Sequence, residues 1–317
     1  MQTYMRSEFF ALLYTNTTKG HAMADIEMRF NRDMLVLSSD LRAGLNRLGV
    51  DSENDLEFMN LVEPDSIRDL LRLELTAGAQ CLVLGTRHMT PAQLAARGMD
   101  GRAKELAVAI FTVADQLKPQ HILVELAPCE LPLDASSKNS LNEHRSQYAA
   151  ASRTFAKENF DAFYLQGFTD TVDLKCALMG LRQVSDKPIF ASVEVDGEGT
   201  LPKRGTLEEA VEVMEEFQAS VAGICVAAGI ESAVELAKRM NAATSLPKLV
   251  ELYVRERNEK QGEATAENPY YCADCMVEAA TKLRGAGVQF LRAAGKASPA
   301  YTGALVAATY GFDVTLS

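Results

Sequence analysis

The sequence predicts a single α/β fold, a (β/α)8 TIM barrel, from three observations. Short apolar runs alternate with longer helical runs from about Ala24 onward. The short runs are mostly apolar without interruption, as strands buried on both faces should be. The length of 317 residues suits one barrel with a single core, although two ordinary domains would also fit it. A doubly wound open sheet shows the same alternation, so periodicity alone leaves that fold open.

The elements follow one another in strict βα order. Eight apolar runs are predicted as strands: Met34–Leu37, Cys81–Leu84, His121–Leu126, Ala162–Leu165, Ile189–Val195, Gly223–Ala227, Leu249–Val254 and Gln289–Arg292. The stretches between them are predicted as helices, and several end at glycine or before proline, as helices do: Pro64–Ala77, Gly101–Leu117, Asn142–Asn159, Asp170–Val184, Thr206–Gln218, Ile230–Met240 and Met276–Ala286.

Two segments lie outside this alternation. Residues 1–23 are predicted to form an N-terminal extension ahead of the barrel domain, which spans residues 24–317. Its apolar patch Phe9–Tyr14 needs a covering surface, which indicates an arm for homo-oligomer formation. The polar run Arg255–Asn268 is predicted to be a loop over the barrel mouth, either a lid or a solvated surface loop.

Composition excludes several classes of partner. The net charge of -11 would repel phosphate backbones, so no nucleic-acid partner is expected. No apolar run approaches the ~20 residues that span a bilayer, so no membrane association is expected. Six cysteines are too few for a disulfide scaffold, and the first residues lack a signal-peptide pattern. We expect a reduced, cytoplasmic protein.

Several motifs keep a common order along the chain. They are Met34–Leu45 with Arg47–Val50, Asn60-Leu61 with Pro64, Ala77-Gly78-Ala79, Asp161–Leu165, Asp196–Leu201 and Gly287–Pro299. In this order and spacing the chain resembles the homocysteine S-methyltransferase family, which includes the homocysteine-binding barrel of cobalamin-dependent methionine synthase. The resemblance implies a TIM barrel and methyl transfer in one-carbon metabolism. It also implies a methyl partner, either a folate or a methyl-corrinoid protein.

The chain departs from the family at the zinc ligands. The resemblance implies one zinc thiolate at the end of the sixth strand and two in the last strand. Cys225 stands at the family's asparagine, Val226 at the first ligand, and Ala294 and Gly295 at the other two. Because zinc needs about four donors, these residues cannot hold the ion. We therefore expect neither the family zinc nor another tightly bound cofactor.

Polar residues remain at the predicted strand ends, where the active site of a barrel converges. The predicted catalytic residues are His88, Glu125 and Glu194, and the predicted substrate-binding residues are Asp40, Arg87, Gln166, Cys225 and Arg292. Arg292 would suit a carboxylate, and the glutamates would suit an ammonium or a cationic methyl donor. The alternative is a satisfied salt-bridge lattice around Arg292 with Glu125, Glu194 or Glu251.

Among the histidines, His88 is the general-base candidate by location. His121 is expected to be structural, and His144, in a polar helical run, is expected to face solvent. The Cys272-Ala273-Asp274-Cys275 motif supplies only two metal donors, so partly buried cysteines, a weak zinc pair or redox-sensitive thiols are all compatible with it.

Three functions follow from these observations. The first is methyl transfer to or from a small molecule without the family zinc. The second is a non-catalytic relative that binds a ligand, a partner methyltransferase or a corrinoid protein. The third is a lyase or aldolase-like barrel that uses Lys296 and His88, although Lys296 lies in a loop of small residues rather than on a strand.

Overall fold

The computed structural model describes residues 25–256 and 260–315. Its centre is one sheet of eight parallel strands in the order β1-β8-β7-β6-β5-β4-β3-β2. The strands are β1 (Leu35–Val36), β2 (Cys81–Leu84), β3 (His121–Leu126), β4 (Ala162–Phe168), β5 (Ile189–Val195), β6 (Val221–Val226), β7 (Lys248–Val254) and β8 (Phe290–Gly295). A parallel bridge between Leu37 and Cys81 joins β1 to β2, so the sheet closes into a barrel and the predicted fold class is confirmed.

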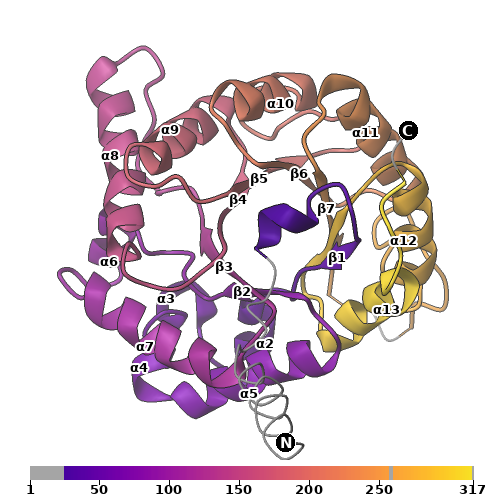
Figure 1. The fold of residues 1–317 in the computed structure, drawn as a ribbon, viewed down its shortest axis with the longest axis horizontal. Coiled ribbons are helices and arrows are strands. Elements are labelled where there is room, and N and C mark those ends of the chain that lie inside the picture. The colour runs from indigo at the N-terminus through magenta and orange to yellow at the C-terminus, as the bar shows by residue number, and fades with distance from the viewer. Residues whose placement is uncertain (1–24, 257–259, 316–317) are drawn as a thin grey trace, which may run out of the picture.

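Helices surround this barrel as a ring (Figure 1). In the described residues they are α2 (Leu41–Arg47), α3 (Ser52–Asp55), α4 (Met59–Val62), α5 (Pro64–Thr76), α6 (Pro91–Ala96), α7 (Ala103–Leu117), α8 (Lys138–Thr154), α9 (Thr171–Arg182), α10 (Leu207–Glu216), α11 (Ile230–Ala243), α12 (Cys275–Gly285) and α13 (Pro299–Thr309). None of them is both long and apolar enough to cross a membrane.

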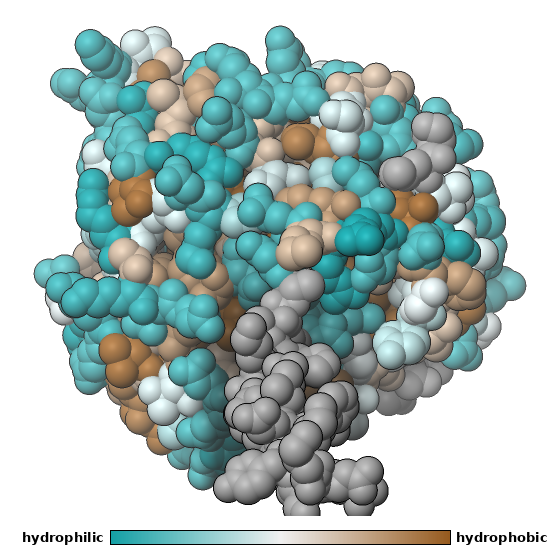
Figure 2. Space-filling view, in the orientation of Figure 1, coloured by the Kyte–Doolittle hydropathy of each residue, from teal (hydrophilic) through white to brown (hydrophobic). Residues whose placement is uncertain are grey.

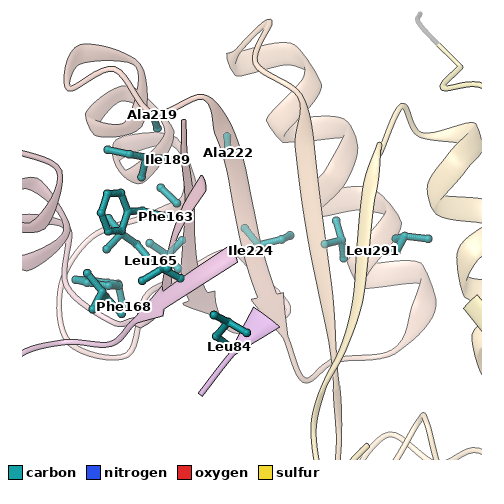
Figure 3. Packing of buried hydrophobic residues seen from close by; sticks show 14 of the residues in the cluster. Leu84, Phe163, Leu165, Phe168, Ile189, Ala219, Ala222, Ile224 and Leu291 are labelled. Atoms are coloured by element: carbon teal, nitrogen blue, oxygen red, sulfur yellow. The ribbon is translucent and has the colours of Figure 1, made fainter. Parts of the chain in front are cut away.

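The side chains form two hydrophobic layers because successive residues of a strand point to opposite faces. An inner cluster, which includes Leu123, Tyr164 and Phe290, fills the barrel. A larger outer cluster lies between the strands and the helices, and Figure 3 shows part of it, including Phe163 and Ile224. Both layers are apolar, which explains why the strands read as continuous hydrophobic runs.

A short 3-10 helix, η1 (Ile26–Arg29), covers the amino-terminal end of the barrel. In Figure 1 it lies across the centre of the ring, and Figure 2 shows the same face as largely hydrophilic. Ile26 joins the inner cluster, and the Phe30 ring packs edge-on against Phe190 and Phe290 at centroid distances of 6.0 Å. With this end filled, the carboxyl ends of the strands, here called the mouth, are left to form a site.

Several predicted boundaries were displaced: β4 ends at Phe168 rather than Leu165, and β8 ends at Gly295 rather than Arg292. Helix α8 spans Lys138–Thr154 rather than 142–159, because the Ser137 side chain accepts a hydrogen bond from the Ser140 N–H and caps the helix earlier. Strand β6 begins at Val221 rather than Gly223, since Val221 and Ala222 already pair with β5.

The predicted N-terminal extension lies outside the described residues, so an arm for homo-oligomer formation stays a prediction.

Candidate active site at the barrel mouth

Neighbouring strands bring four polar side chains into one row at the mouth. Register pairs Glu194 with Cys225, Cys225 with Glu251, and Glu251 with Arg292, across β5, β6, β7 and β8. Residues paired in register point to the same face of a sheet, so this row faces the barrel interior. Three residues of this row, Glu194, Cys225 and Arg292, are among those predicted from the sequence for the site.

Arg292 lies at the centre of a buried network and is 1% exposed. Its Nε donates to the Ser38 carbonyl at 3.0 Å and its Nη1 donates to the Tyr164 hydroxyl at 3.1 Å. Its guanidinium forms ion pairs with Glu251 at 3.5 Å and with Glu125 at 3.8 Å. Burial opposes a charged guanidinium, yet Tyr164 and the glutamates outweigh it and hold the pKa of Arg292 well above its usual range. The lattice around Arg292 is present with Glu125 and Glu251.

Glu251 has protein partners for both carboxylate oxygens. Ser192 donates to Oε1 at 2.5 Å, and the Gln166 amide donates to Oε2 at 3.4 Å. Burial raises the pKa of the Glu251 carboxyl, and the attraction of Arg292 offsets only part of this. Glu251 is therefore more easily protonated than an ordinary glutamate, and it belongs to the floor of the mouth rather than to its surface.

A second arginine, Arg87, extends the network outward. It donates to Glu125 Oε1 at 2.8 Å and also to the Gln166 side-chain oxygen. The side chain of Arg87 is 13% exposed, compared with 2% for that of Arg292. An ideal Cβ on Gly167 would lie 2.8 Å from Arg87 Nη2 and 3.6 Å from Glu194 Oε1, which places these two side chains close to one another over a glycine.

Asp40 closes the mouth on the side of β1. It caps helix α2, and its carboxylate forms an ion pair with Arg42 at 2.6 Å. Burial alone would raise the pKa of the Asp40 carboxyl, but the charges of Arg42, Arg292 and Arg87 outweigh burial and lower it well below its usual range. Asp40 is therefore an ionised, paired carboxylate that anchors α2.

This depressed pKa predicts a pH-dependent stability. A carboxyl with a lowered folded-state pKa stabilises the fold above its unfolded-state pKa of 3.8, and the contribution is lost as the pH falls toward the folded-state value. We expect Asp40→Asn to reduce the free energy of unfolding at pH 7, with the deficit shrinking as the pH falls below 3.8. Urea denaturation across this range measures it. Asp65→Asn, in an exposed pair with Arg68, is the control, and an Asp40→Asn deficit that is constant with pH would contradict the assignment.

Glu194 and Cys225 differ from the rest of the cluster. Glu194 is partly exposed, and within residues 25–256 and 260–315 its carboxylate has no hydrogen bond or ion pair. Cys225 is 5% exposed; burial, followed by the charges of Glu251 and Glu194, raises the pKa of its thiol well above the ordinary value. In the part of the chain that the structure describes, the mouth therefore offers the unpaired Glu194 carboxylate beside the neutral Cys225 thiol.

The structure separates His88 and Lys296 from this cluster. His88 is 1% exposed; its backbone N–H donates to Glu57 Oε1 at 2.7 Å, and its Nδ1 lies 3.3 Å from Glu57 Oε2. Glu57 was not predicted because it lies in a short segment between α3 and α4 that carries no motif. Lys296 is exposed, so it lacks the desolvated setting that a Schiff-base lysine requires.

Comparison with known proteins decides the family. The sequence profile of the homocysteine S-methyltransferases matches residues 32–297. The chain belongs to the homocysteine S-methyltransferase family. No curated protein matches it in sequence.

Solved structures agree on the fold. Homocysteine methyltransferase MmuM from Escherichia coli is 16% identical, and the match covers 87% of this chain and 96% of that one. The TM-score is 0.70 for its metallated form and 0.71 for its oxidized form. At this identity the likeness supports the barrel and not the details of the site.

Three positions matter most for comparison with the family. Val226 packs in the outer cluster between strands and helices, and Ala294 has no donor atom in its side chain. Gly295 has a left-handed backbone with φ +69°, and a Cβ there would lie 2.6 Å from the Val254 carbonyl oxygen. In the described residues, the one close group of three histidine, cysteine or carboxylate donors lies elsewhere, at Cys129, His144 and Asp173.

The Cys272–Cys275 pair lies where α12 begins. The two sulfur atoms are 3.5 Å apart, and both residues are partly buried. Burial, followed by Cys272, raises the pKa of the Cys275 thiol to about 11, so this thiol is not activated. No third metal donor lies close to the pair in the described part of the chain.

Proposed function

We propose that this family member transfers a methyl group to or from a small molecule at the barrel mouth, without the family zinc ion. The observation that carries the proposal is the partly exposed Glu194, which has no partner among the described residues and lies beside a cluster whose other charges are paired. Removing an unpaired carboxylate from water is unfavourable unless a positive charge compensates it. The Glu194 carboxylate is therefore available to a ligand of complementary charge. A cationic methyl donor, either a sulfonium or a quaternary ammonium compound, has that charge.

The reaction needs no metal if a carboxylate takes up the acceptor's proton. With a thiol acceptor, the S–H bond breaks and the sulfur electron pair forms the new bond to the methyl carbon. The bond between that carbon and the cationic centre breaks, and its electron pair stays with the leaving group, which becomes neutral. The proton passes to Glu194. Arg87, fixed by Glu125 and Gln166, lies beside Glu194 over Gly167 and would orient a carboxylate of the acceptor.

The donor set supports the absence of zinc from the mouth. The positions that supply thiolates in the family carry Val226, Ala294 and Gly295, none of which has a side-chain donor. Cys225 is a single thiol between two glutamates, with a raised pKa. One donor of this kind does not make a tetrahedral site. A folate or a methyl-corrinoid protein, in place of a free cationic donor, remains within this proposal as the methyl partner.

The role of Glu194 can be tested by a neutral isostere. A screen of homocysteine and related thiols with methylated amines, sulfonium compounds, folates and corrinoids identifies a donor and an acceptor by mass spectrometry. We expect Glu194→Gln to lower the rate of methyl transfer at least about tenfold, since a positioned base typically contributes more than that. Glu198→Gln makes the same change at an exposed position in the following loop and should leave the rate unchanged. Equal rates in both variants would remove Glu194 from the reaction.

A specific observation also favours a non-catalytic relative that binds a ligand, a partner methyltransferase or a corrinoid protein. Arg292, Glu251, Glu125 and Arg87 already satisfy one another, and the Cys225 thiol is neutral. In that case calorimetry would detect binding of one of the screened compounds or partners, dependent on Glu194, and no product would form.

A lyase on Lys296 and His88 has no such support, because Lys296 is exposed and His88 pairs with Glu57.

A further inference from the structure

A second polar cluster lies among the helices, away from the mouth. It joins Cys129 in the loop after β3, His144 on α8 and Asp173 on α9. His144 Nδ1 lies 3.4 Å from Cys129 Sγ and 3.2 Å from Asp173 Oδ1. Cys129 and His144 are almost completely buried, whereas the Asp173 side chain is 14% exposed. The prediction that His144 faces solvent was wrong.

Close packing of two helices explains why His144 is buried. An ideal Cβ on Gly180 of α9 would lie 2.4 Å from the Arg145 carbonyl oxygen and 2.9 Å from Tyr148 Cβ on α8. Only a glycine allows this approach, and it brings the polar face of α8 against α9. The buried polar residues on that face then need partners within the protein.

The two separations from His144 Nδ1 match those of a tetrahedral zinc site. Zinc bonds of about 2.3 Å to sulfur and about 2.0 Å to nitrogen or oxygen place sulfur about 3.5 Å from nitrogen at tetrahedral angles. They place nitrogen about 3.3 Å from oxygen. The observed 3.4 Å and 3.2 Å are close to these values, and all three donor atoms lie within 4.8 Å of one another.

Surrounding hydrogen bonds orient the three donors as the outer shell of a metal site does. His144 Nε2 lies 3.3 Å from the Pro132 carbonyl, which can only accept, so Nε2 carries the proton. The Nδ1 lone pair then faces a sulfur and a carboxylate oxygen, and these groups can share only a proton or a metal cation. The Tyr148 hydroxyl donates to Asp173 Oδ1 at 3.1 Å and accepts from the Cys129 N–H at 3.0 Å, which fixes two of the donors.

We propose that Cys129, His144 and Asp173 bind a zinc ion, against the expectation from the sequence that no cofactor is tightly bound. Sulfur, imidazole and carboxylate donors together suit this borderline-soft divalent cation, and three protein ligands leave the fourth position to water. The partly exposed Asp173 provides the entry path for the ion. Since the site joins the loop after β3 to α8 and α9, its metal stabilises the outer layer of the barrel. The proposal does not depend on methyl transfer at the mouth.

Metal binding by defined variants tests this site. The protein is purified without chelator, and its zinc content is measured. The metal is then stripped, and Zn²⁺ or Co²⁺ is added back in competition with a chromophoric chelator to measure the affinity for the metal. We expect one zinc per chain and a cobalt adduct with thiolate-to-metal charge-transfer absorption. Cys129→Ser and Asp173→Asn should each weaken zinc binding at least about tenfold. Cys176→Ser, at a nearby buried cysteine whose thiol contacts the Leu141 carbonyl, should bind zinc like the parent.

Two results would overturn the proposal. In the first, the stripped parent protein is still folded by circular dichroism but fails to bind Zn²⁺, and added Zn²⁺ does not change its melting temperature. A proton shared among the three side chains, and not a metal ion, then holds the cluster together. In the second, zinc binds as tightly to Cys129→Ser as to the parent. If that zinc is instead lost in Cys225→Ser, the metal lies at the mouth, and the proposed zinc-free chemistry fails while the fold assignment stands.

Discussion

Replacing Arg292 with alanine is expected to lower the free energy of unfolding by about 3–5 kcal/mol, because it leaves buried carboxylates without their cation. Glu251 would lose its ion pair, and Glu125 would keep only Arg87. The Tyr164 hydroxyl and the Ser38 carbonyl would each lose a donor. Urea denaturation at pH 7 measures the change.

Arg204→Ala serves as the control for Arg292→Ala. Arg204 pairs with Asp170 at 3.6 Å, and its side chain is 45% exposed, so its loss should cost less than about 1 kcal/mol. If Arg292→Ala unfolds at the same urea concentration as Arg204→Ala, the buried network does not stabilise the barrel. Arg292 would then be free to bind a ligand, as the sequence suggested.

Gly295→Cys places a cysteine at a position that the resemblance matches to a family zinc ligand, and we expect it to destabilise the protein. The left-handed backbone at φ +69° costs a non-glycine residue about 1–2 kcal/mol. The new Cβ also meets the Val254 carbonyl oxygen at 2.6 Å and the Tyr253 ring at 2.9 Å, and overpacking of this kind costs about 1–3 kcal/mol more. Thermal and urea unfolding of the variant measure the sum.

Gly49→Cys separates these two contributions. Gly49 has a similar backbone, with φ +81°, but a Cβ there meets no atom of the described residues within 4 Å. It should therefore show the backbone cost alone. Equal destabilisation by the two cysteines would mean that the last strand has room for a side chain at position 295, which would weaken the case against a thiolate site there.

The sequence predicted the barrel and the inward residues of its last strands because both depend on local pattern. Continuous apolar runs identified the strands. A polar residue near the end of such a run, as in β7 and β8, faces the barrel interior when it is an even number of residues away from an inner-cluster residue of the same strand. The row from Glu194 to Arg292 follows from this alternation of inward and outward side chains and from the parallel register of the strands. Tyr164, a partner of Arg292, was missed because a tyrosine in an apolar strand resembles ordinary core.

The pairing of individual side chains could not be predicted because it depends on contacts between distant segments. His88 appeared to be a base near the mouth, yet its partner Glu57 comes from a segment 31 residues away. The Cys129, His144 and Asp173 cluster requires α8 and α9 to touch at Gly180, which no spacing reveals. A histidine flanked by polar residues looks exposed until the neighbouring helix is placed.

Methyl transfer by metal-depleted protein distinguishes zinc-free from zinc-dependent chemistry at the barrel mouth. The stripped protein, shown to be folded at the assay temperature, is incubated with the donor and acceptor found by screening, with and without added Zn²⁺, and an isotopically labelled methyl group is followed into product. We predict equal transfer in both conditions. Transfer that needs zinc and disappears in Cys225→Ser would contradict the account, and so would the absence of transfer under either condition.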